Sequence, residues 1–276
     1  MKTLQDLKNL YITKMAPDLE ALEQERKKIV EKLAYIGVGI LTVCLVIFAL
    51  FFNKVQDTSS LFIIPGAIGL VFFFGAYHFL TRDYIRSFKT KIIKRIVTFF
   101  DKNLEYSATS CIPQSQFVSC GIFKRSPDRY KGDDLIRGTL GATHLEFSEI
   151  HAEYKTEHSD NGRRRRQWHT IFKGLFFVAD FNKHFKGRTI ILPDTAERIF
   201  GHIGKMFQSW NIGRGKLGKL VKLEDPEFEK LFAVYSDDQI EARYILSTSL
   251  MKRIVDFKNK SKRPIHLSFF QSKVYV

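Results

Sequence analysis

Cysteine is scarce in this sequence, and the residues present show no paired spacing. Cys44 lies in an apolar stretch, whereas Cys111 and Cys120 lie in the polar C-terminal part, and the chain has no CxxC pair. Unpaired cysteines in an odd number do not indicate a disulfide framework, which small secreted domains use in place of a large core. We therefore expect free thiols in a reducing compartment, with a bridge between Cys111 and Cys120 as the alternative.

The sequence also lacks the short motifs HExxH and GxSxG, which mark common metal and nucleophile sites. His151-Ala152-Glu153 has the HxE spacing of zinc deaminases, but no PCxxC follows it. Gly213–Lys219 (GRGKLGK) has the spacing of a phosphate-binding loop. However, Leu220 stands where Ser or Thr would bind magnesium, and a helix is expected before the loop in place of a strand. We expect no metal, no nucleotide and no other cofactor.

Carboxylates at Asp133, Asp134, Asp180 and Asp194 fall at expected turns, where aspartate is common because its side chain bonds nearby backbone groups. A catalytic pair among these four is the minor alternative. The catalytic residues of any enzymatic activity are therefore unknown from the sequence.

Charge is nearly absent from residues 33–80, which contain only Lys54 and Asp57. The runs Leu33–Phe52 and Leu61–Leu80 have 20 residues each and no charged side chain. At about 1.5 Å per residue each helix would span about 30 Å, the thickness of the hydrocarbon core of a bilayer. Because the connector Asn53–Ser60 has only eight residues, the sequence predicts a hairpin of two transmembrane helices.

Basic residues flank this hairpin on both sides and predict its orientation. The second group is the larger: Arg26, Lys27, Lys28 and Lys32 precede the first run, and Arg82, Arg86, Lys89, Lys91, Lys94 and Arg95 follow the second. Cytoplasmic flanks carry such an excess, so both ends of the chain are expected in the cytoplasm. A cleaved signal peptide is the weaker alternative, because about 32 polar residues precede an apolar run that is too long for one.

Amphipathic helices are expected on both sides of the hairpin, in residues 1–32 and 81–106. Ala16-Pro17-Asp18 is expected to begin a new helix that continues into the first span, since proline suits a first turn. The basic helix of residues 81–106 either pairs with the N-terminal helix as a stalk or lies on anionic headgroups. The apolar stripe on each segment favours the stalk.

Residues 107–276 alternate between apolar and polar side chains and predict a strand-rich cytoplasmic domain. Leu145–Tyr154 changes phase, so we expect a bulge near Ser148–Glu149. Trp168–Phe181 is nearly continuous in apolar residues and predicts a central strand buried on both faces, followed by a strand at Arg188–Leu192. The fold class is α+β, with a small pleckstrin-homology-like barrel as one possible architecture.

The remaining elements of this domain are predicted from capping and periodicity. The expected elements are a helix that Asp194 begins, a helix at Asp225-Pro226, a strand at Ala233–Tyr235, a helix at Ile240–Leu246 capped by Ser236 with Gln239, an amphipathic helix at Thr248–Lys258, and a single strand at His266–Val276. Strands and helices mixed in this order are typical of an α+β domain.

Four consecutive arginines, Arg163, Arg164, Arg165 and Arg166, followed by Trp168, are the most distinctive local feature. They lie between an expected hairpin tip at His158–Gly162 and the central strand. Charge runs are most often solvated loops. A site for anionic lipid headgroups is the first functional alternative, and an acidic protein partner is the second. Nucleic acid is the last of the alternatives, because no aromatic residues are interleaved with the arginines.

Three residue strings resemble an uncharacterised bacterial family, domain of unknown function 3137. They are Phe172–Lys183 (FKGLFFVADFNK), Thr189–Asp194 (TIILPD) and Phe232–Leu246 (FAVYSDDQIEARYIL). The resemblance implies an N-terminal helix, two spans, a cytoplasmic domain and a location in the bacterial inner membrane. It adds no catalytic residues. It also implies that relatives continue past the last strand, which puts the closure of that sheet edge in doubt.

Taken together, these features favour a membrane-anchored cytoplasmic interaction module or scaffold subunit. The expected partners are the membrane, anionic lipid headgroups, and another protein or a second copy of the chain. One alternative is an enzyme that acts on a membrane-associated substrate through dispersed residues. Another is a structural subunit of a membrane protein complex, because glycines in both spans offer small contact surfaces.

Overall fold

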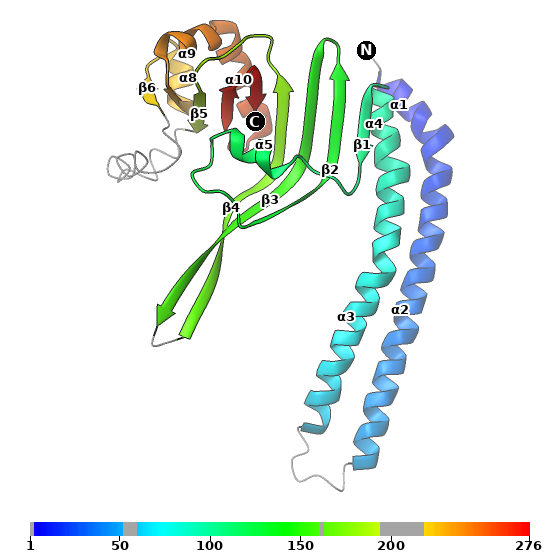
Figure 1. Cartoon of the computed structure of the whole chain (residues 1–276). Helices are drawn as coiled ribbons and strands as arrows, with labels where there is room; N and C mark the ends of the chain where they lie inside the picture. The colour runs from blue at the N-terminus through cyan, green and yellow to red at the C-terminus, as the bar shows by residue number, and fades with distance from the viewer. Residues whose placement is uncertain (1–2, 52–59, 161–162, 194–217) are drawn as a thin grey trace. The chain divides into compact units, whose positions relative to one another are not determined.

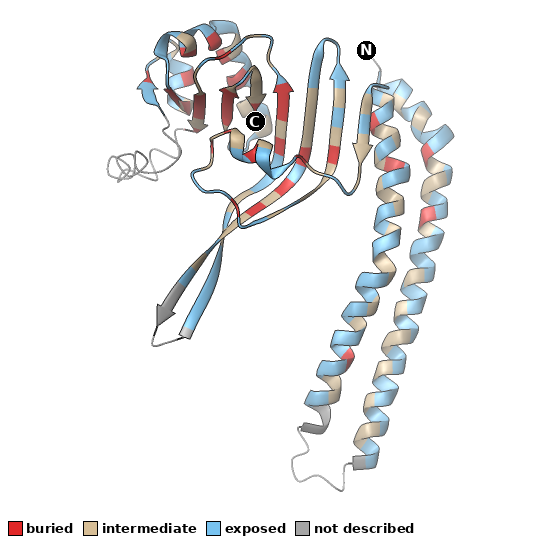
Figure 2. Cartoon of the chain, viewed as in Figure 1, coloured by how far each residue is buried: buried red, intermediate tan, exposed pale blue. Residues whose placement is uncertain are grey.

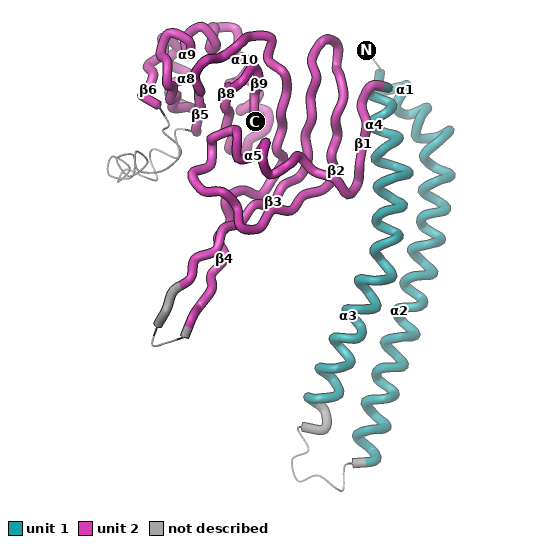
Figure 3. The backbone as a smooth tube through the Cα atoms, viewed as in Figure 1, with its two compact units in different colours: residues 1–102 teal, residues 103–276 magenta. Residues whose placement is uncertain are grey.

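The computed structural model describes residues 3–51, 60–160, 163–193 and 218–276 (Figure 1). The chain divides into two compact units, Met1–Lys102 and Asn103–Val276 (Figure 3). The first unit is helical and the second is built on a large sheet, so the α+β class expected from the sequence is confirmed.

The N-terminal unit consists of two long helical arms that run side by side (Figure 1). A capping box between Thr3 and Asp6 begins the first arm. A five-residue π-helical turn interrupts each arm. The first arm contains α1 (Leu4–Leu10), η1 (Tyr11–Met15) and α2 (Ala16–Phe51), and the second contains α3 (Ser60–Phe88), η2 (Lys89–Ile93) and α4 (Lys94–Phe100).

Away from the apolar runs, the two arms pack together as the stalk interpretation expects. Met15, Leu22 and Ile92 are buried between them. Arg95 donates to the carboxylate of Asp18 across the pair. The helical part of the second arm ends at Phe100 and not at residue 106, because residues 104–107 belong to a strand.

The apolar part of each arm leaves most of its side chains uncovered, as the pale blue of Figure 2 shows. Both arms contain a helix long and apolar enough to cross a membrane. The helices approach closely at Gly69, where an added Cβ would lie 2.5 Å from the side chain of Ile40. Pro65 lies inside α3, where its missing N–H removes one hydrogen bond of the helix.

The described residues of the C-terminal unit form a nine-stranded sheet in the order β1-β2-β3-β4-β9-β8-β5-β7-β6, with every pair antiparallel. The strands are β1 (Leu104–Ser107), β2 (Arg129–Leu140), β3 (Thr143–Asp160), β4 (Arg163–Asp180), β5 (Thr189–Pro193), β6 (Lys219–Val221), β7 (Phe232–Ser236), β8 (Leu267–Phe270) and β9 (Lys273–Tyr275). Pairing of β1 with β6, which would close a barrel, is not seen in this part of the chain.

Four helices in the described residues of this unit cover two of its apolar clusters. They are α5 (Gln114–Ser119), α8 (Pro226–Leu231), α9 (Gln239–Ile245) and α10 (Thr248–Ser261). Helices α8 to α10 bury apolar side chains against β5, β7 and β8, with Phe228 and Phe269 among the largest. Helix α5 and the loop after it cover β3 and β4, where Phe117 lies 5.2 Å from Phe176 between ring centroids.

Strand β4 is buried on one face along most of its apolar run, so the prediction of a strand buried on both faces holds only near its end, where Ala179 of the other face is also buried. Phe176 and Val178 are buried under α5, whereas Leu175, on the opposite face, is 58% exposed. On that opposite face Phe177 pairs with Phe147 at 6.0 Å. The apolar run of β4 therefore combines the side chains of a buried face with a partly covered aromatic residue, Phe177, on the opposite face.

The expected bulge lies at the expected place but in the neighbouring strand. Residues Asp134 and Leu135 of β2 face Ser148 of β3, and Asp134 adopts a positive φ of 57°. In β3 the buried face continues in phase through Ser148 and Ile150. Ser148 can lie in this face because its hydroxyl accepts the N–H of Ile112 at 3.0 Å, and its polarity suggested a phase change that does not occur.

Two further predictions near the C-terminus are corrected. Asp238, and not Ser236, caps α9, because its side chain accepts the N–H groups of Ile240 and Glu241. The segment His266–Val276 is a hairpin of β8 and β9, turned at residues 271–272, which both have positive φ.

Strand β9 lies between β4 and β8, inside the sheet. The helix expected after Asp194 and most of the loop Gly213–Lys219 lie outside the described residues.

The one-sided burial of β4 can be tested with two adjacent substitutions. We expect Phe176→Ala to lower the free energy of unfolding by about 3–5 kcal/mol, because it opens a cavity under α5. We expect Leu175→Ala to lower it by less than about 1 kcal/mol, since surface positions contribute little. Chemical denaturation of the detergent-solubilised chain measures both values, and equal losses would contradict one-sided burial.

Candidate functional site

Strands β3 and β4 extend beyond the rest of the sheet as a two-stranded ribbon (Figure 1). Strand β2 pairs with β3 only as far as Glu153, and β9 pairs with β4 only from Val178 to Asp180. Residues 154–160 and 163–169 therefore have no third strand among the described residues. At about 3.3 Å per residue, the ribbon extends for about 23 Å from the sheet.

The arginine run lies in strand β4 of this ribbon and not in a loop. Arg163, Arg164, Arg165 and Arg166 stand opposite Asp160, Ser159, His158 and Glu157. Successive side chains of a strand alternate between faces, so Arg164 and Arg166 share a face with Trp168. Arg166 donates to Glu157 at 3.1 Å. Among the described side chains, Arg164 and Arg165 have no acidic partner and are exposed to solvent.

Aromatic and cationic side chains stabilise the base of the ribbon on both faces. On one face the guanidinium of Arg129 lies 3.9 Å from the ring centroid of Trp168 and pairs with Glu153 at 3.2 Å. On the other, Arg125 lies 4.4 Å from the ring of Tyr154.

The ring of Tyr154 also stacks on His169 at 4.9 Å. An isolated two-stranded ribbon is marginally stable in water, so these contacts explain why this one is ordered at its base. The sequence identified Trp168, but it gave no signal for Arg125 or Arg129, because their contacts join distant segments.

A second group of polar residues lies around the bulge of β2. Side-chain oxygen atoms of Asp133, Asp134 and Glu149 lie within 4.8 Å of one another. The hydroxyl of Tyr106 donates to Asp134, and burial together with this carboxylate raises the pKa of Tyr106. Burial raises the pKa of the Cys111 thiol, and the charge of Asp133 adds to the effect. Both groups are therefore protonated at neutral pH.

A shallow depression of about 500 Å³ adjoins this cluster on the face of the sheet opposite α5. Lys131, His151 and Lys173 line it together with Glu149. Of the four carboxylates considered from the sequence, Asp133 and Asp134 come together, Asp180 lies at the end of β4, and Asp194 is outside the described residues. His151 and Glu153, the HxE pair, lie 3.6 Å apart.

The basic residues after the second apolar run are distributed along α3, η2 and α4. Arg82, Arg86, Lys91 and Lys94 are exposed, and Lys89 is half-buried. Arg95 differs from them, because it lies in the contact between the two arms and also donates to the carbonyl of Lys14. The six residues are therefore four exposed cations, the half-buried Lys89, and Arg95 in an ion pair between the arms.

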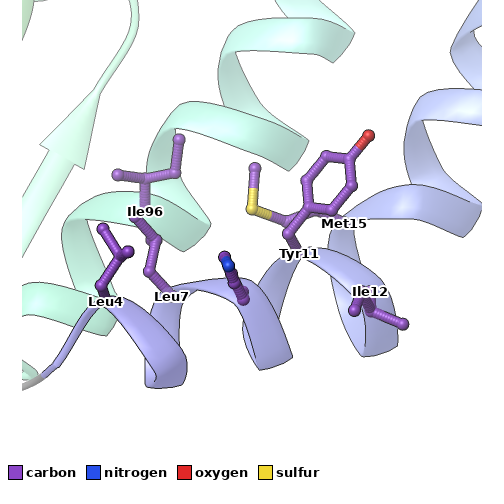
Figure 4. Close-up of a pocket in the computed structure, with 7 residues that line it drawn as sticks. Leu4, Leu7, Tyr11, Ile12, Met15 and Ile96 are labelled. Carbon is purple, nitrogen blue, oxygen red and sulfur yellow. The ribbon is translucent and has the colours of Figure 1, made fainter.

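The tip of the N-terminal unit has an apolar groove of about 530 Å³. Its side chains come from α1, η1 and α4, and Figure 4 shows Leu7, Met15 and Ile96 directed toward its centre. The groove continues the apolar contact between the two arms. The exposed residues Leu4 and Ile12 lie at its outer rim.

The contact between Arg129 and Trp168 can be tested by removing the ring. We expect Trp168→Ala to speed amide hydrogen exchange in residues 154–169 by roughly 2- to 30-fold, since a cation–π contact contributes about 0.5–2 kcal/mol. Thr170→Ala, on the same face and exposed, is the matched control and should leave exchange unchanged. Equal exchange in both variants would show that the ring does not stabilise the ribbon.

Comparison with known proteins supports the resemblance found in the residue strings. No curated protein and no solved structure matches this chain. Residues 170–276 match the model of the family described as "Protein of unknown function (DUF3137)". This range runs from the second half of β4 to the C-terminal hairpin. The C-terminal part of the chain therefore belongs to the DUF3137 family.

Proposed function

We propose that this protein is a membrane-anchored interaction module that binds an acidic protein partner through its arginine ribbon. In this proposal the two apolar helices cross the bacterial inner membrane as a hairpin, and both flanking parts lie in the cytoplasm. The observation that carries the proposal is the ribbon itself, a projecting pair of strands with exposed arginines on both faces.

The membrane part of the proposal is supported by exposure and charge. Each apolar run has 20 uncharged residues, and its large side chains, such as Leu41 and Phe72, are mostly exposed. Such a surface is unfavourable in water and favourable in hydrocarbon. The exposed basic residues Arg82 and Arg86, just after the second run, match the cytoplasmic excess of positive charge in membrane proteins.

The length of the stalk favours a protein partner over lipid headgroups. From Leu80 to Phe100 the second arm is helical, and at about 1.5 Å per residue it extends for about 30 Å beyond the span. Electrostatic attraction in physiological salt is screened over about 8 Å. At the end of this arm the attraction of the leaflet is therefore screened. Basic residues beside the spans are the ones placed for headgroups.

The ribbon is also better suited to a protein partner in its chemistry. Arginine forms planar, two-pronged hydrogen bonds with carboxylates, and its side chain packs on aromatic and apolar groups. Arg164 and Arg165 are exposed on opposite faces, so a partner that grips the ribbon can pair with both. Charge pairs of this kind fix the orientation of a complex and speed its formation.

Cross-linking in native membranes tests this function. A photo-reactive amino acid at exposed Gln167 should capture a cytoplasmic or membrane protein. We expect the joint substitution Arg164→Ser, Arg165→Ser and Arg166→Ser to reduce capture at least tenfold, because it removes the ion pairs of the ribbon. The charge-matched control replaces Lys252, Arg253 and Lys260, exposed on α10, with serine and should retain capture.

Two outcomes would contradict the proposal. One is equal capture in both triple variants, which would show that the ribbon arginines do not select the partner. The other is binding of the full chain, held in neutral nanodiscs, to vesicles of anionic lipid with loss in the ribbon variant alone. That result would assign the arginines to lipid headgroups.

A further inference from the structure

Strand β9 covers only one end of the outer edge of β4. The last bonded pair is formed by Phe177 and Val276, whose backbone groups exchange two hydrogen bonds of 2.8 and 2.9 Å. Along residues 163–176, β4 has a strand partner on the β3 side alone among the described residues. Among the described residues, this part of β4 is therefore an open edge, although β4 itself lies in the interior of the strand order.

The alternation of the ladder shows which backbone groups this edge presents. Antiparallel pairs alternate between hydrogen-bonded and non-hydrogen-bonded. Because Phe177 directs its N–H and C=O toward Val276, the same must hold for Leu175 and Lys173, two and four residues before it. Both residues, and Gly174 between them, are exposed. The edge thus offers two adjacent sets of donors and acceptors in line with β9.

The cationic side chains of β4 have acidic residues opposite them on the β3 side only, among the described strands. Residues 163–176 contain five cationic side chains and no acidic one, whereas residues 149–160 of β3 contain four acidic side chains and one lysine. Opposite charges on neighbouring strands stabilise a pair, as Arg166 and Glu157 illustrate. The outer side of β4 has the same cationic residues and no strand to complement them in the described part of the chain.

Charged side chains and bulges also protect edge strands from unwanted pairing, and β4 has both. Its bulge lies at Ile171, between the arginines and residues 173–175. Residues 173–175 are less protected, because Gly174 has no side chain and Leu175 presents an exposed apolar one. The edge therefore combines an accessible backbone with a cationic continuation.

We propose that the outer edge of β4, from Leu175 toward the arginines, receives an extended acidic segment of the partner protein as an added strand in line with β9. This inference rests on the proposed function and specifies how the partner binds. Main-chain hydrogen bonds to Leu175 and Lys173 would supply affinity, as in other cases of strand addition. Acidic side chains on the segment would pair with Lys173 and the arginine run and supply selectivity.

The test uses the full chain in nanodiscs and a fluorescent, acetylated peptide of alternating Glu and Val. We expect saturable binding, and protection of the Leu175 and Lys173 amides from hydrogen exchange. The same peptide with N-methyl groups at its central residues keeps its charge but cannot form a strand pair. It should bind at least tenfold more weakly.

A protein variant gives the complementary measurement. Leu175→Pro removes an outward N–H without removing a bond to β3, and should weaken peptide binding at least tenfold. Leu175→Ala is the control and should change binding less than threefold. If the N-methylated peptide binds as well as the parent, or if the protected amides lie outside residues 172–177, strand addition is wrong. That failure leaves arginine-dependent capture of a partner intact, so the two proposals are separable.

Discussion

The rest of the N-terminal unit depends on two stretches of helix that carry no charge and expose large apolar side chains. A helix satisfies its own backbone hydrogen bonds, so such stretches can enter hydrocarbon with only apolar side chains exposed. Their short connector keeps the two helices adjacent and antiparallel. Adjacency then continues outside the apolar region, where Leu22 and Ile92 are buried between the arms and Arg95 is paired with Asp18. The stalk thus follows from the pairing of the two apolar helices that it extends.

The sequence predicted the elements whose signals are local and failed where a distant partner decides. Uncharged runs, the proline at the start of α8 and the periodicity of α10 indicated elements that the structure contains. In contrast, Ser148 suggested a phase change because its hydrogen bond to Ile112, 36 residues away, could not be read from the pattern. The apolar run of β4 gave no indication that α5 covers one face alone. Serine and aspartate both suit a helix cap, so only geometry distinguished Asp238 from Ser236.

The residues of the candidate site were predicted from the sequence only in part. The arginine run was evident, but its place in a strand required the pairing of β3 and β4 beyond the rest of the sheet. Arg125 and Arg129 lie at the base of the ribbon. Their role in stabilising it follows only from the structure, which places them over the rings of Tyr154 and Trp168. The ribbon is therefore a stiffened projection with charge at its far end.

The carboxylate cluster at the β2 bulge is the place on which an enzymatic function would centre. There, Tyr106 remains protonated at neutral pH and donates a hydrogen bond to Asp134, which accounts for one of the three carboxylates. The exposed arginines and the open edge of β4 are better explained by binding than by chemistry. In the proposed function, the ribbon is the recognition surface and the apolar helices are the membrane anchor.

The most direct test of this account is the accessibility of single cysteines in a chain whose own three cysteines are replaced by serine. Gln56→Cys lies in the connector between the apolar runs, and Gln167→Cys lies in the ribbon. In spheroplasts, a membrane-impermeant maleimide should label Gln56→Cys at once and Gln167→Cys only after the membrane is opened. Labelling of the ribbon cysteine in intact spheroplasts, or protection of the connector cysteine, would contradict the hairpin and the cytoplasmic location of the domain.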